Sequence, residues 1–336
     1  MKTFATIAAV CVALVVAPAA AQGPQPAAAQ RIEVRAERID SFALQDSSRT
    51  RFGALEFRGG LILTSPYRRF GGLSALRVAP DGARFLALSD RGHWFRGRIV
   101  YRGDRPVGLD EVETAPVLGP DGRAVTVRRW FDTESLAEMN GTLYVGIERA
   151  NQILRFEYAR DGLAARGVPI AVPPGVRTLV HNGGLECLAA PGRGQPLGGT
   201  LIAISEKSLD ERGNIRAFLI GGPRPGNFAV RRSADFDVTD CAVTPRGDLL
   251  ILERRFTLAL GVAMRIRRVS LLQIAPGALV DGPVLIEADG THQIDNMEGL
   301  SVHRNAAGEI ILTLISDDNF SRLQRTLLLQ FALVGE

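Results

Sequence analysis

Acidic residues recur at one place in a repeated sequence pattern, and they are the side chains best suited to chemistry. The recurring positions are Glu134, Glu186, Asp240 and Glu298, with Ser74 in the same register of an earlier copy. Carboxylates that converge repel one another unless they are protonated, paired with arginine or bound to a cation. Oxygen-rich clusters of this kind suit a hard cation. We therefore expect these four acids to bind Ca²⁺, or another divalent metal, as a cofactor.

A second set of acids stands where the following apolar run ends in each copy. These strand-end residues are Asp90, Glu148, Glu206, Glu253, Asp317 and Asp318. We expect Asp90, Asp317 and Asp318 to complete the metal site at its rim. The run Asp317-Asp318-Asn319 offers the most oxygen ligands and has no adjacent arginine, so it is the preferred metal-binding strand end.

Arginines beside these acids allow two interpretations. Arg91, Arg149 and Arg254 could hold an anionic substrate, because a guanidinium donates two parallel hydrogen bonds to a phosphate or a carboxylate. The same arginines could instead form salt bridges between neighbouring copies. The second interpretation does not explain why an acid recurs on the first strand of four copies. Both interpretations stay open.

The sequence offers no strong covalent nucleophile. It contains no Gly-x-Ser-x-Gly motif, since Gly72-Leu73-Ser74-Ala75 lacks the second glycine. Its four histidines are not spaced as His-Glu-x-x-His. A hydrolase built on this chain would therefore use a metal-activated water. Its catalytic candidates are Glu186, Glu298 and Asp240.

The elements that position these acids are predicted to be paired β-strands. Each copy has a first apolar run, a connecting turn or loop, and a second apolar run that ends in charged residues. Five copies recur every 50 to 60 residues or so, a period typical of four-stranded propeller blades. Strands within residues 31–65 and 326–331 would form a sixth blade and remove the open sheet edges. The prediction is an all-β fold, a six-bladed β-propeller closed by N- and C-terminal strands; a double β-sandwich is the alternative.

Cys187 and Cys241 each follow an aligned acid, where the other copies carry Ala75, Ser135 and Gly299. Only small side chains occupy this place, which suggests a crowded inner strand. Free cysteine behaves as a small, readily buried residue. We therefore expect two buried thiols rather than a disulfide.

The N-terminus reads as an export signal. Lys2 precedes the apolar stretch Phe4–Val16, and Ala19-Ala20-Ala21 resembles a cleavage site. We predict a signal peptide over residues 1–22, a flexible leader over 23–30 and a single domain over 31–336. No later segment approaches the roughly 20 apolar residues of a membrane span. A periplasmic or secreted protein is expected.

The net charge of +4 is too small to indicate a nucleic-acid partner, and the positive charge is scattered arginine. A small anionic ligand is compatible with that distribution. We expect a monomer without a nucleic-acid or membrane-spanning role.

Several motifs together resemble the phytase-like family, whose bacterial members are described as having "esterase-like activity of phytase". They are Phe70-Gly71-Gly72-Leu73-Ser74, Leu88-Ser89-Asp90-Arg91-Gly92, Asp132-Thr133-Glu134-Ser135, Asn182-Gly183-Gly184-Leu185-Glu186, Asp295-Asn296-Met297-Glu298-Gly299-Leu300 and Ser316-Asp317-Asp318-Asn319-Phe320. The resemblance runs from about residue 50 to the C-terminus. It implies a propeller, a Ca²⁺ requirement and hydrolysis of ester or phosphate-ester bonds.

The favoured hypothesis is an exported, metal-dependent hydrolase of small anionic esters, with phosphoesters preferred. The alternative is a non-catalytic propeller that binds a ligand or a partner of the cell envelope and uses its acids structurally. A lactonase would share the architecture but would have little need for the arginines.

Overall fold

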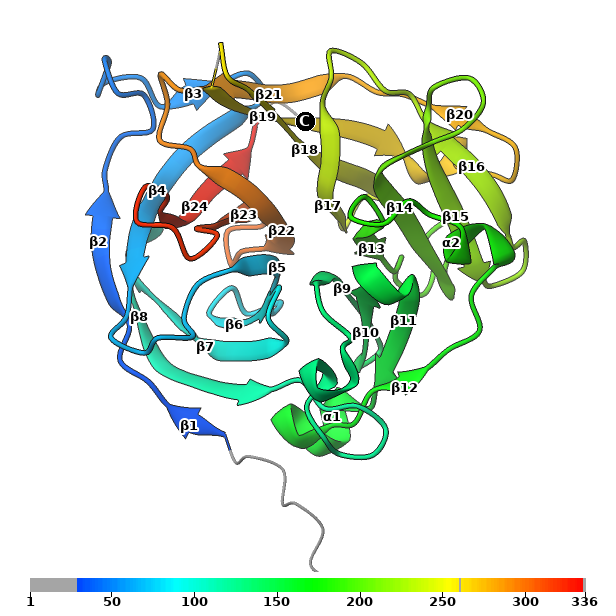
Figure 1. Ribbon diagram of the computed structural model, residues 1–336. Helices are drawn as coiled ribbons and strands as arrows, with labels where there is room; N and C mark the ends of the chain where they lie inside the picture. Colours follow the sequence, from blue (N-terminus) through cyan, green and yellow to red (C-terminus); the bar gives the residue numbers. More distant parts are fainter. Residues whose placement is uncertain (1–28, 260, 335–336) are drawn as a thin grey trace, which may run out of the picture.

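The computed structural model describes residues 29–259 and 261–334. Within them the strands form five β-sheets around a central axis, so the chain is a five-bladed β-propeller (Figure 1). The prediction of an all-β propeller is confirmed, and the predicted number of six blades is wrong. The sheets surround one axis, which excludes the double β-sandwich.

The strands of each blade are given from the axis outward. Blade 1 contains β5 (Leu73–Val78), β6 (Arg84–Ser89), β7 (His93–Arg102), β8 (Arg105–Pro116) and β1 (Gln30–Arg31). Blade 2 contains β9 (Thr133–Met139), β10 (Thr142–Ile147), β11 (Gln152–Phe156) and β12 (Val168–Pro169). Blade 3 contains β13 (Leu185–Ala189), β14 (Thr200–Leu209), β15 (Ile215–Gly221), β16 (Gly226–Val230) and β20 (Leu279–Val280).

Blade 4 contains β17 (Asp237–Val243), β18 (Asp248–Thr257), β19 (Gly261–Ser270) and β21 (Val284–Asp289). Blade 5 contains β22 (Asn296–Arg304), β23 (Ile310–Asp317), β24 (Thr326–Leu333), β4 (Leu55–Thr64) and β2 (Arg35–Ile39), with β3 (Arg51–Phe52) paired to β4. The helices are short: α1 (Tyr158–Asp161), α2 (Pro174–Arg177) and the 3₁₀ turns η1 (Val125–Arg128), η2 (Glu148–Ala150), η3 (Gly162–Ala164) and η4 (Leu271–Gln273).

The N-terminal strands complete the fifth blade and do not form a sixth. The fifth copy of the repeat supplies only β22, β23 and β24, so the outer edge of β24 needs a partner. β4 pairs antiparallel along that edge, from Thr326↔Leu63 to Leu333↔Leu55. The expected joining of N- and C-terminal strands is therefore present, and it closes the ring within the blade of the last copy.

The inner strands contact one another in a closed ring, β5 to β9, β13, β17, β22 and back to β5. The core lies between neighbouring blades, because each sheet buries both of its faces. One cluster, for example, packs Ile204 of blade 3 against Leu249 and Ile251 of blade 4. Every residue of β23 is buried, as expected for the continuous apolar run that the sequence shows there.

Each inner strand carries a bulge near its start, where one residue has no partner in the register. The bulged residues are Ser74, Glu134, Glu186, Thr239 and Glu298. A bulge re-aims a side chain and bends the strand. The alignment of acids is thus correct in β9, β13 and β22 and is displaced by one residue in β17, where Thr239 rather than Asp240 is bulged.

Cys187 and Cys241 form a disulfide between the inner strands of blades 3 and 4, with their Cα atoms 5.2 Å apart. The expectation of two free thiols is wrong. In the closed ring β13 and β17 are neighbours, which brings the two cysteines within bridging distance. Loop-closure entropy over the 54-residue separation gives a stabilisation of about 4 kcal/mol.

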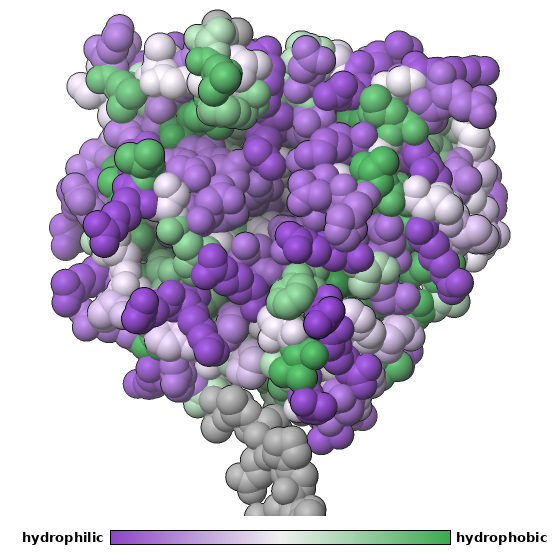
Figure 2. Space-filling view, in the orientation of Figure 1, coloured by the Kyte–Doolittle hydropathy of each residue, from purple (hydrophilic) through white to green (hydrophobic). Residues whose placement is uncertain are grey.

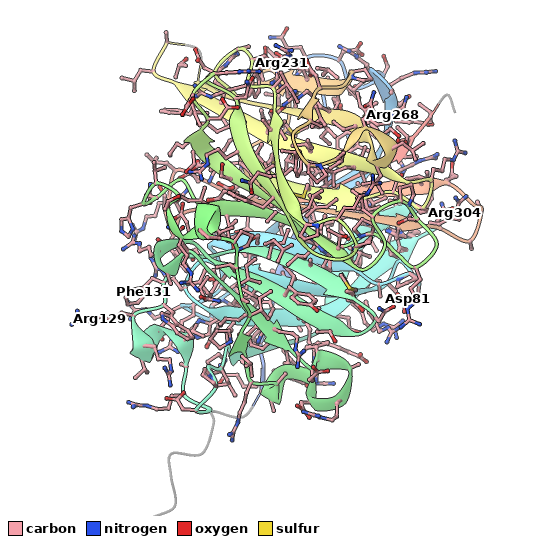
Figure 3. The ribbon with its side chains drawn as sticks, turned by 90° about the vertical axis from the view of Figure 1, so that its right-hand side faces the viewer. Asp81, Arg129, Phe131, Arg231, Arg268 and Arg304 are labelled. Atoms are coloured by element: carbon pink, nitrogen blue, oxygen red, sulfur yellow. A yellow bond between two sulfur atoms is a disulfide. The ribbon has the colours of Figure 1, made fainter. Side chains whose placement is uncertain are left out.

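The two faces of the propeller differ. Inner strands begin on the face that carries Arg129 and Phe131 and run toward the face that carries Asp81 and Arg304 (Figure 3). The predicted signal peptide and most of the leader lie outside the described residues. Gln30, the last leader residue, belongs to β1 and pairs with Thr114 of β8. Among the described residues, no helix is long and apolar enough to cross a membrane.

Candidate functional site

Two rings of side chains meet at the face where the inner strands begin. The first ring is the set of bulged residues, Ser74, Glu134, Glu186, Thr239 and Glu298. The second ring comes from the second strand of each blade. Each member directly follows the residue of that strand that pairs just before the bulge, and the members are Asp90, Glu148, Glu206, Arg254 and Asp317. We call these two rings the acidic mouth. The centre of this face is hydrophilic and hollowed (Figure 2).

Blade 4 contributes no acid to either ring, because its members are Thr239 and Arg254. The hydroxyl of Thr239 donates to the Met297 carbonyl at 2.9 Å. Ser74 of blade 1 similarly donates to the Thr133 carbonyl at 2.6 Å. Where the bulged residue is not an acid, it therefore bonds to the next blade and leaves the mouth to the carboxylates.

Three glutamates of the mouth come close enough to share one cation. Carboxylate oxygens of Glu148, Glu186 and Glu206 all lie within 4.8 Å of one another, and all three residues are buried. Glu148 accepts a hydrogen bond of 3.0 Å from the Gly184 amide, which fixes its position beside the next blade. Carboxylate oxygens suit a hard divalent cation such as Ca²⁺. We call Glu148, Glu186 and Glu206 the glutamate triad.

Asn151 adds a neutral oxygen at the edge of the triad. Its Oδ1 is buried and accepts no hydrogen bond from the described residues. A Cβ placed on Gly184 would lie 3.0 Å from both Asn151 Oδ1 and the Cγ of Glu148, so both side chains border this glycine. Ca²⁺ takes six to eight oxygens, amide carbonyls among them, which makes Asn151 a candidate for a further ligand.

Basic groups balance only part of this negative charge. Arg254 bridges two blades, with Nε 3.1 Å from Glu298 Oε1 and Nη2 3.4 Å from Glu206 Oε1. Lys207 lies 3.0 Å from the second oxygen of Glu206. Within the described parts of the chain, Glu134, Glu148 and Glu186 form no ion pair. The mouth therefore holds more buried negative charge than its own bases neutralise.

The pKa values in the mouth reflect this excess. Burial raises the pKa of Glu186 well above its usual value, and repulsion from Glu134 and Glu206 adds to it. Burial likewise raises the pKa of Glu134, followed by repulsion from Glu298 and Asp90. Glu134 keeps some solvent contact because it faces the opening. Ionising all of these groups at once is unfavourable unless a cation joins them.

Burial is also the main cause of the raised pKa values of the remaining acids of the mouth. It raises the pKa of Asp90 to about 6 and that of Asp317 to about 7. It raises the pKa of Glu298 to about 8, although Arg254 opposes the shift. Glu298 also accepts a hydrogen bond of 2.9 Å from the Asn296 amide. Burial raises the pKa of Glu148 too, and the Gly184 amide opposes it.

The structure brings Glu134, Glu186, Glu298, Asp90 and Asp317 together and keeps Asp240 apart. Asp240 is buried below the mouth, where it accepts hydrogen bonds from the Leu300 amide at 2.8 Å and from Arg77 at 3.3 Å. Burial raises its pKa to about 7 against the pull of Arg77. Asp240 therefore does not share the surroundings of the other predicted metal ligands and catalytic residues.

Asp318 shapes the rim of the mouth. Its oxygens accept hydrogen bonds of 3.0 Å from the amides of Gly72 and Phe320 and from the Thr326 hydroxyl. Gly72 has a φ of +61°, and a Cβ there would lie 2.3 Å from Asp90 Oδ1, so only glycine fits between these acids. Asp318 is thus occupied in holding the β23–β24 loop against blade 1, and the metal-competent group is the triad of blades 2 and 3.

The three predicted anion-binding arginines have different surroundings. Arg149 pairs with Asp132, and Arg254 pairs with Glu206 and Glu298 as described above. Arg91 is exposed and stacks on Phe320, with its guanidinium carbon 3.4 Å from the ring centre. No described residue forms an ion pair with Arg91. It is the arginine best placed to receive an anion at the rim.

Sequence reasoning identified Glu148 and Glu206 as strand-end acids and did not assign them to a metal. Each has a base next to it in sequence, Arg149 or Lys207, which suggested a local salt bridge. Glu148 and Glu206 occupy equivalent positions in successive copies of the repeat. This equivalence is the sequence feature that could have indicated their proximity to Glu186. Asn151 carried no such signal, because it lies beyond the repeated motif.

A family model described as "Phytase-like: Esterase-like activity of phytase" matches residues 68–320. No curated protein matches the chain significantly. Similar solved structures include an α-L-arabinofuranosidase from Podospora anserina in complex with cellotriose, 10% identical with a TM-score of 0.48 over 83% of this chain and 97% of that chain. A glutaminyl cyclase from Myxococcus xanthus is 9% identical with a TM-score of 0.42 over 79% and 92% of the two chains. At these values the similarities carry no information on function.

Proposed function

The chain belongs to the phytase-like family, and we propose that it is an exported, divalent-cation-dependent hydrolase of small anionic esters. Phosphoesters are the preferred substrates and Ca²⁺ the preferred cation. The family's description as esterase-like supports hydrolysis. Export is supported by Lys2 and the apolar stretch that follows it.

The observation that carries this proposal is the glutamate triad. Three buried carboxylates from two blades lie within 4.8 Å of one another, and only Glu206 has basic partners among the described ion pairs. Buried carboxylates that serve only as structure are expected to be paired. The donor set therefore fits a hard cation better than it fits a network of salt bridges.

A divalent cation held by Glu148, Glu186 and Glu206 would polarise an ester oxygen and make a bound water more acidic. Glu298 stands across the mouth, held by Arg254 and Asn296, where it can accept or donate a proton. Glu186 and Glu298 keep their proposed catalytic roles. Asp240 loses its own because it lies below the mouth.

Arg91 is proposed to receive the anionic group of the substrate. Its guanidinium is exposed at the rim and oriented by Phe320, and arginine recognises phosphate and carboxylate through paired hydrogen bonds. Arg254 is proposed to orient Glu206 and Glu298 and not the substrate, because its guanidinium forms ion pairs with these two carboxylates.

The non-catalytic alternative has one observation in its favour. The Arg254 bridge from Glu206 to Glu298 could serve to hold blades 3, 4 and 5 together. Under that alternative the mouth would bind a ligand or an envelope partner without turnover.

Hydrolysis assays distinguish the two functions. The purified mature protein is offered aryl phosphates, carboxyl esters and lactones, each with Ca²⁺ and with chelator. We expect chelator-sensitive turnover that is fastest on aryl phosphates and is lost in Glu186→Gln. Glu113→Gln is the matched control, because Glu113 pairs with Arg96 on the outer strands of blade 1, away from the mouth. Failure of the wild type to turn over any substrate class, with Ca²⁺ present, would favour the binding propeller.

A further inference from the structure

One arginine touches all five inner strands. The guanidinium of Arg77 in β5 donates to the carbonyls of Leu76, Leu136, Leu188 and Leu300 and to the carboxylate of Asp240. The distances to the Leu188 and Leu300 carbonyls are both 3.0 Å. These acceptors belong to β5, β9, β13, β22 and β17. The guanidinium therefore lies at the centre of the ring of blades.

The four carbonyls are equivalent positions of the repeat. Each belongs to the second residue after a bulge, as the pairings Leu76↔Ala87, Leu136↔Val145, Leu188↔Ala203 and Leu300↔Leu314 show. Blade 4 again differs, and there the carboxylate of Asp240 takes the place of the carbonyl. It supplies a negative charge to the half-buried guanidinium of Arg77. This is the physical reason that Asp240 lies apart from the mouth.

Arg77 lies between a cavity on the axis and the bulged acids of the mouth. A cavity of about 270 Å³ opens at the far ends of the inner strands. Its lining includes Arg77, Ala137, Ala189, Ala242 and Val302, which come from all five inner strands. The bulged acids lie on the other side of the guanidinium, nearer the starts of the same strands.

We propose that Arg77 is a positioning residue for the acidic mouth. Its guanidinium holds the carbonyls that lie two residues beyond Glu134, Glu186 and Glu298, and so sets the spacing of the strands that carry these carboxylates. The planar fork presents five N–H donors in a fixed geometry, whereas a lysine ammonium presents three. This inference rests on the proposed cation site.

The test measures cation affinity, with Tb³⁺ luminescence as the readout and Ca²⁺ as the competitor. We expect the Arg77→Lys variant to fold and to bind Tb³⁺ about tenfold more weakly than the wild type, the scale seen when a supporting residue behind metal ligands is changed. Arg267→Lys is the matched control, because Arg267 likewise pairs with carboxylates of the fold but its partners, Glu253 and Asp281, lie outside the mouth. It should lower the melting temperature and leave Tb³⁺ affinity unchanged.

The Tb³⁺ measurements test the cation site and the role of Arg77 separately. Wild-type protein that binds no Tb³⁺ overturns the proposed cation site and this inference with it. Wild-type binding with unchanged affinity in Arg77→Lys overturns the role of Arg77 alone, and so does an equal loss in Arg267→Lys. If Arg77→Lys does not fold, Asp240→Asn decides instead, because it removes the charge partner and keeps the carbonyl contacts. Its affinity is expected to fall, by less than in Arg77→Lys, since it weakens only one support behind the ligands, and an unchanged affinity contradicts the proposal.

Discussion

Adjacent residues of β18 enter two buried charge clusters of opposite character. Glu253 is buried against β19, where Arg265 and Arg267 each donate to it at 2.7 Å and Arg267 also donates to Asp281 at 2.8 Å. Arg254 faces the acidic mouth, where its guanidinium pairs with two carboxylates, Glu206 and Glu298. The two residues point to opposite sides because side chains alternate along a strand.

The difference shows which cluster is complete. Around Glu253 the guanidinium donors satisfy the buried carboxylate, so nothing further is needed. In the mouth, Glu134, Glu148 and Glu186 have no basic partner among the described residues, and their pKa values are raised by burial. A buried charge without a partner is unfavourable. The Glu253 cluster is therefore electrostatically satisfied within the fold, whereas the carboxylates of the mouth require protons or a cation.

The largest effect, on the free energy of unfolding, is expected from disrupting the Glu253 cluster. In Arg267→Met, Glu253 loses one of its two guanidinium partners and Asp281 loses a donor. Removing one member of a buried ion pair destabilises a protein by about 3–5 kcal/mol, and urea unfolding measures this loss. Arg84→Met is the control, because Arg84 and its partner Asp81 are exposed, and its stability should hardly change. Equal stability in the two variants would mean that the Glu253 cluster is not the structural element described here.

A smaller effect is expected from changing the pH of chelator-treated protein. The folded-state pKa values of Asp90, Asp317 and Glu298 are raised to about 6, 7 and 8 by burial. A raised pKa stabilises the fold below the ordinary value near 4, and this stability is lost as the pH rises through the folded value. We expect the free energy of unfolding to fall by at least about 2 kcal/mol from pH 4 to pH 8, since one pKa unit is worth about 1.4 kcal/mol.

Urea unfolding across this pH range, with and without saturating Ca²⁺, measures the effect. Ca²⁺ should stabilise the protein more as the pH rises, because deprotonated ligands bind metal. Asp317→Asn should flatten the chelator-treated curve. A stability that rises with pH in chelator would show that the acids of the mouth are already satisfied as anions.

The smallest effect is expected at the rim. Arg91→Gln removes a charged donor that has no ion-pair partner among the described residues, so the fold should be unaffected. KM for an aryl phosphate should rise about tenfold, the lower end for a charged hydrogen bond, with little change in kcat. Steady-state kinetics on an aryl phosphate and a neutral ester measure this selectivity. Arg149→Gln is the control, since its guanidinium is engaged by Asp132; an equal change in both variants would remove Arg91 from substrate binding.

Part of this arrangement could be predicted from the sequence. The period of the repeat leads to a propeller, and Glu134, Glu186 and Glu298 converge as their equivalent positions indicate. Aligning the copies of the repeat could not identify Thr239 as the bulged residue of blade 4, because Asp240 after it aligns equally well with the other acids. A shift of one residue along a strand places the side chain on the opposite face of the sheet. Asp240 therefore belongs with Arg77.

The rest depends on distances between blades. The pairing of β4 with β24, which makes five blades rather than six, cannot be read from strand propensity alone. The Cys187–Cys241 disulfide requires β13 and β17 to be neighbours. Arg77 resembles any other arginine in sequence, and its role becomes visible only when the five inner strands surround it.

The central claim is that the glutamate triad binds a divalent cation, and calorimetric titration of Ca²⁺ into chelator-stripped protein tests it most directly. We predict saturable binding to the wild type and to Glu113→Gln, whose changed residue lies in blade 1 away from the mouth. We also predict at least a tenfold loss of affinity in each of Glu148→Gln, Glu186→Gln and Glu206→Gln, because each removes a charged ligand. Absence of binding to the wild type, or undiminished binding when all three glutamates are replaced by glutamine, would contradict this claim.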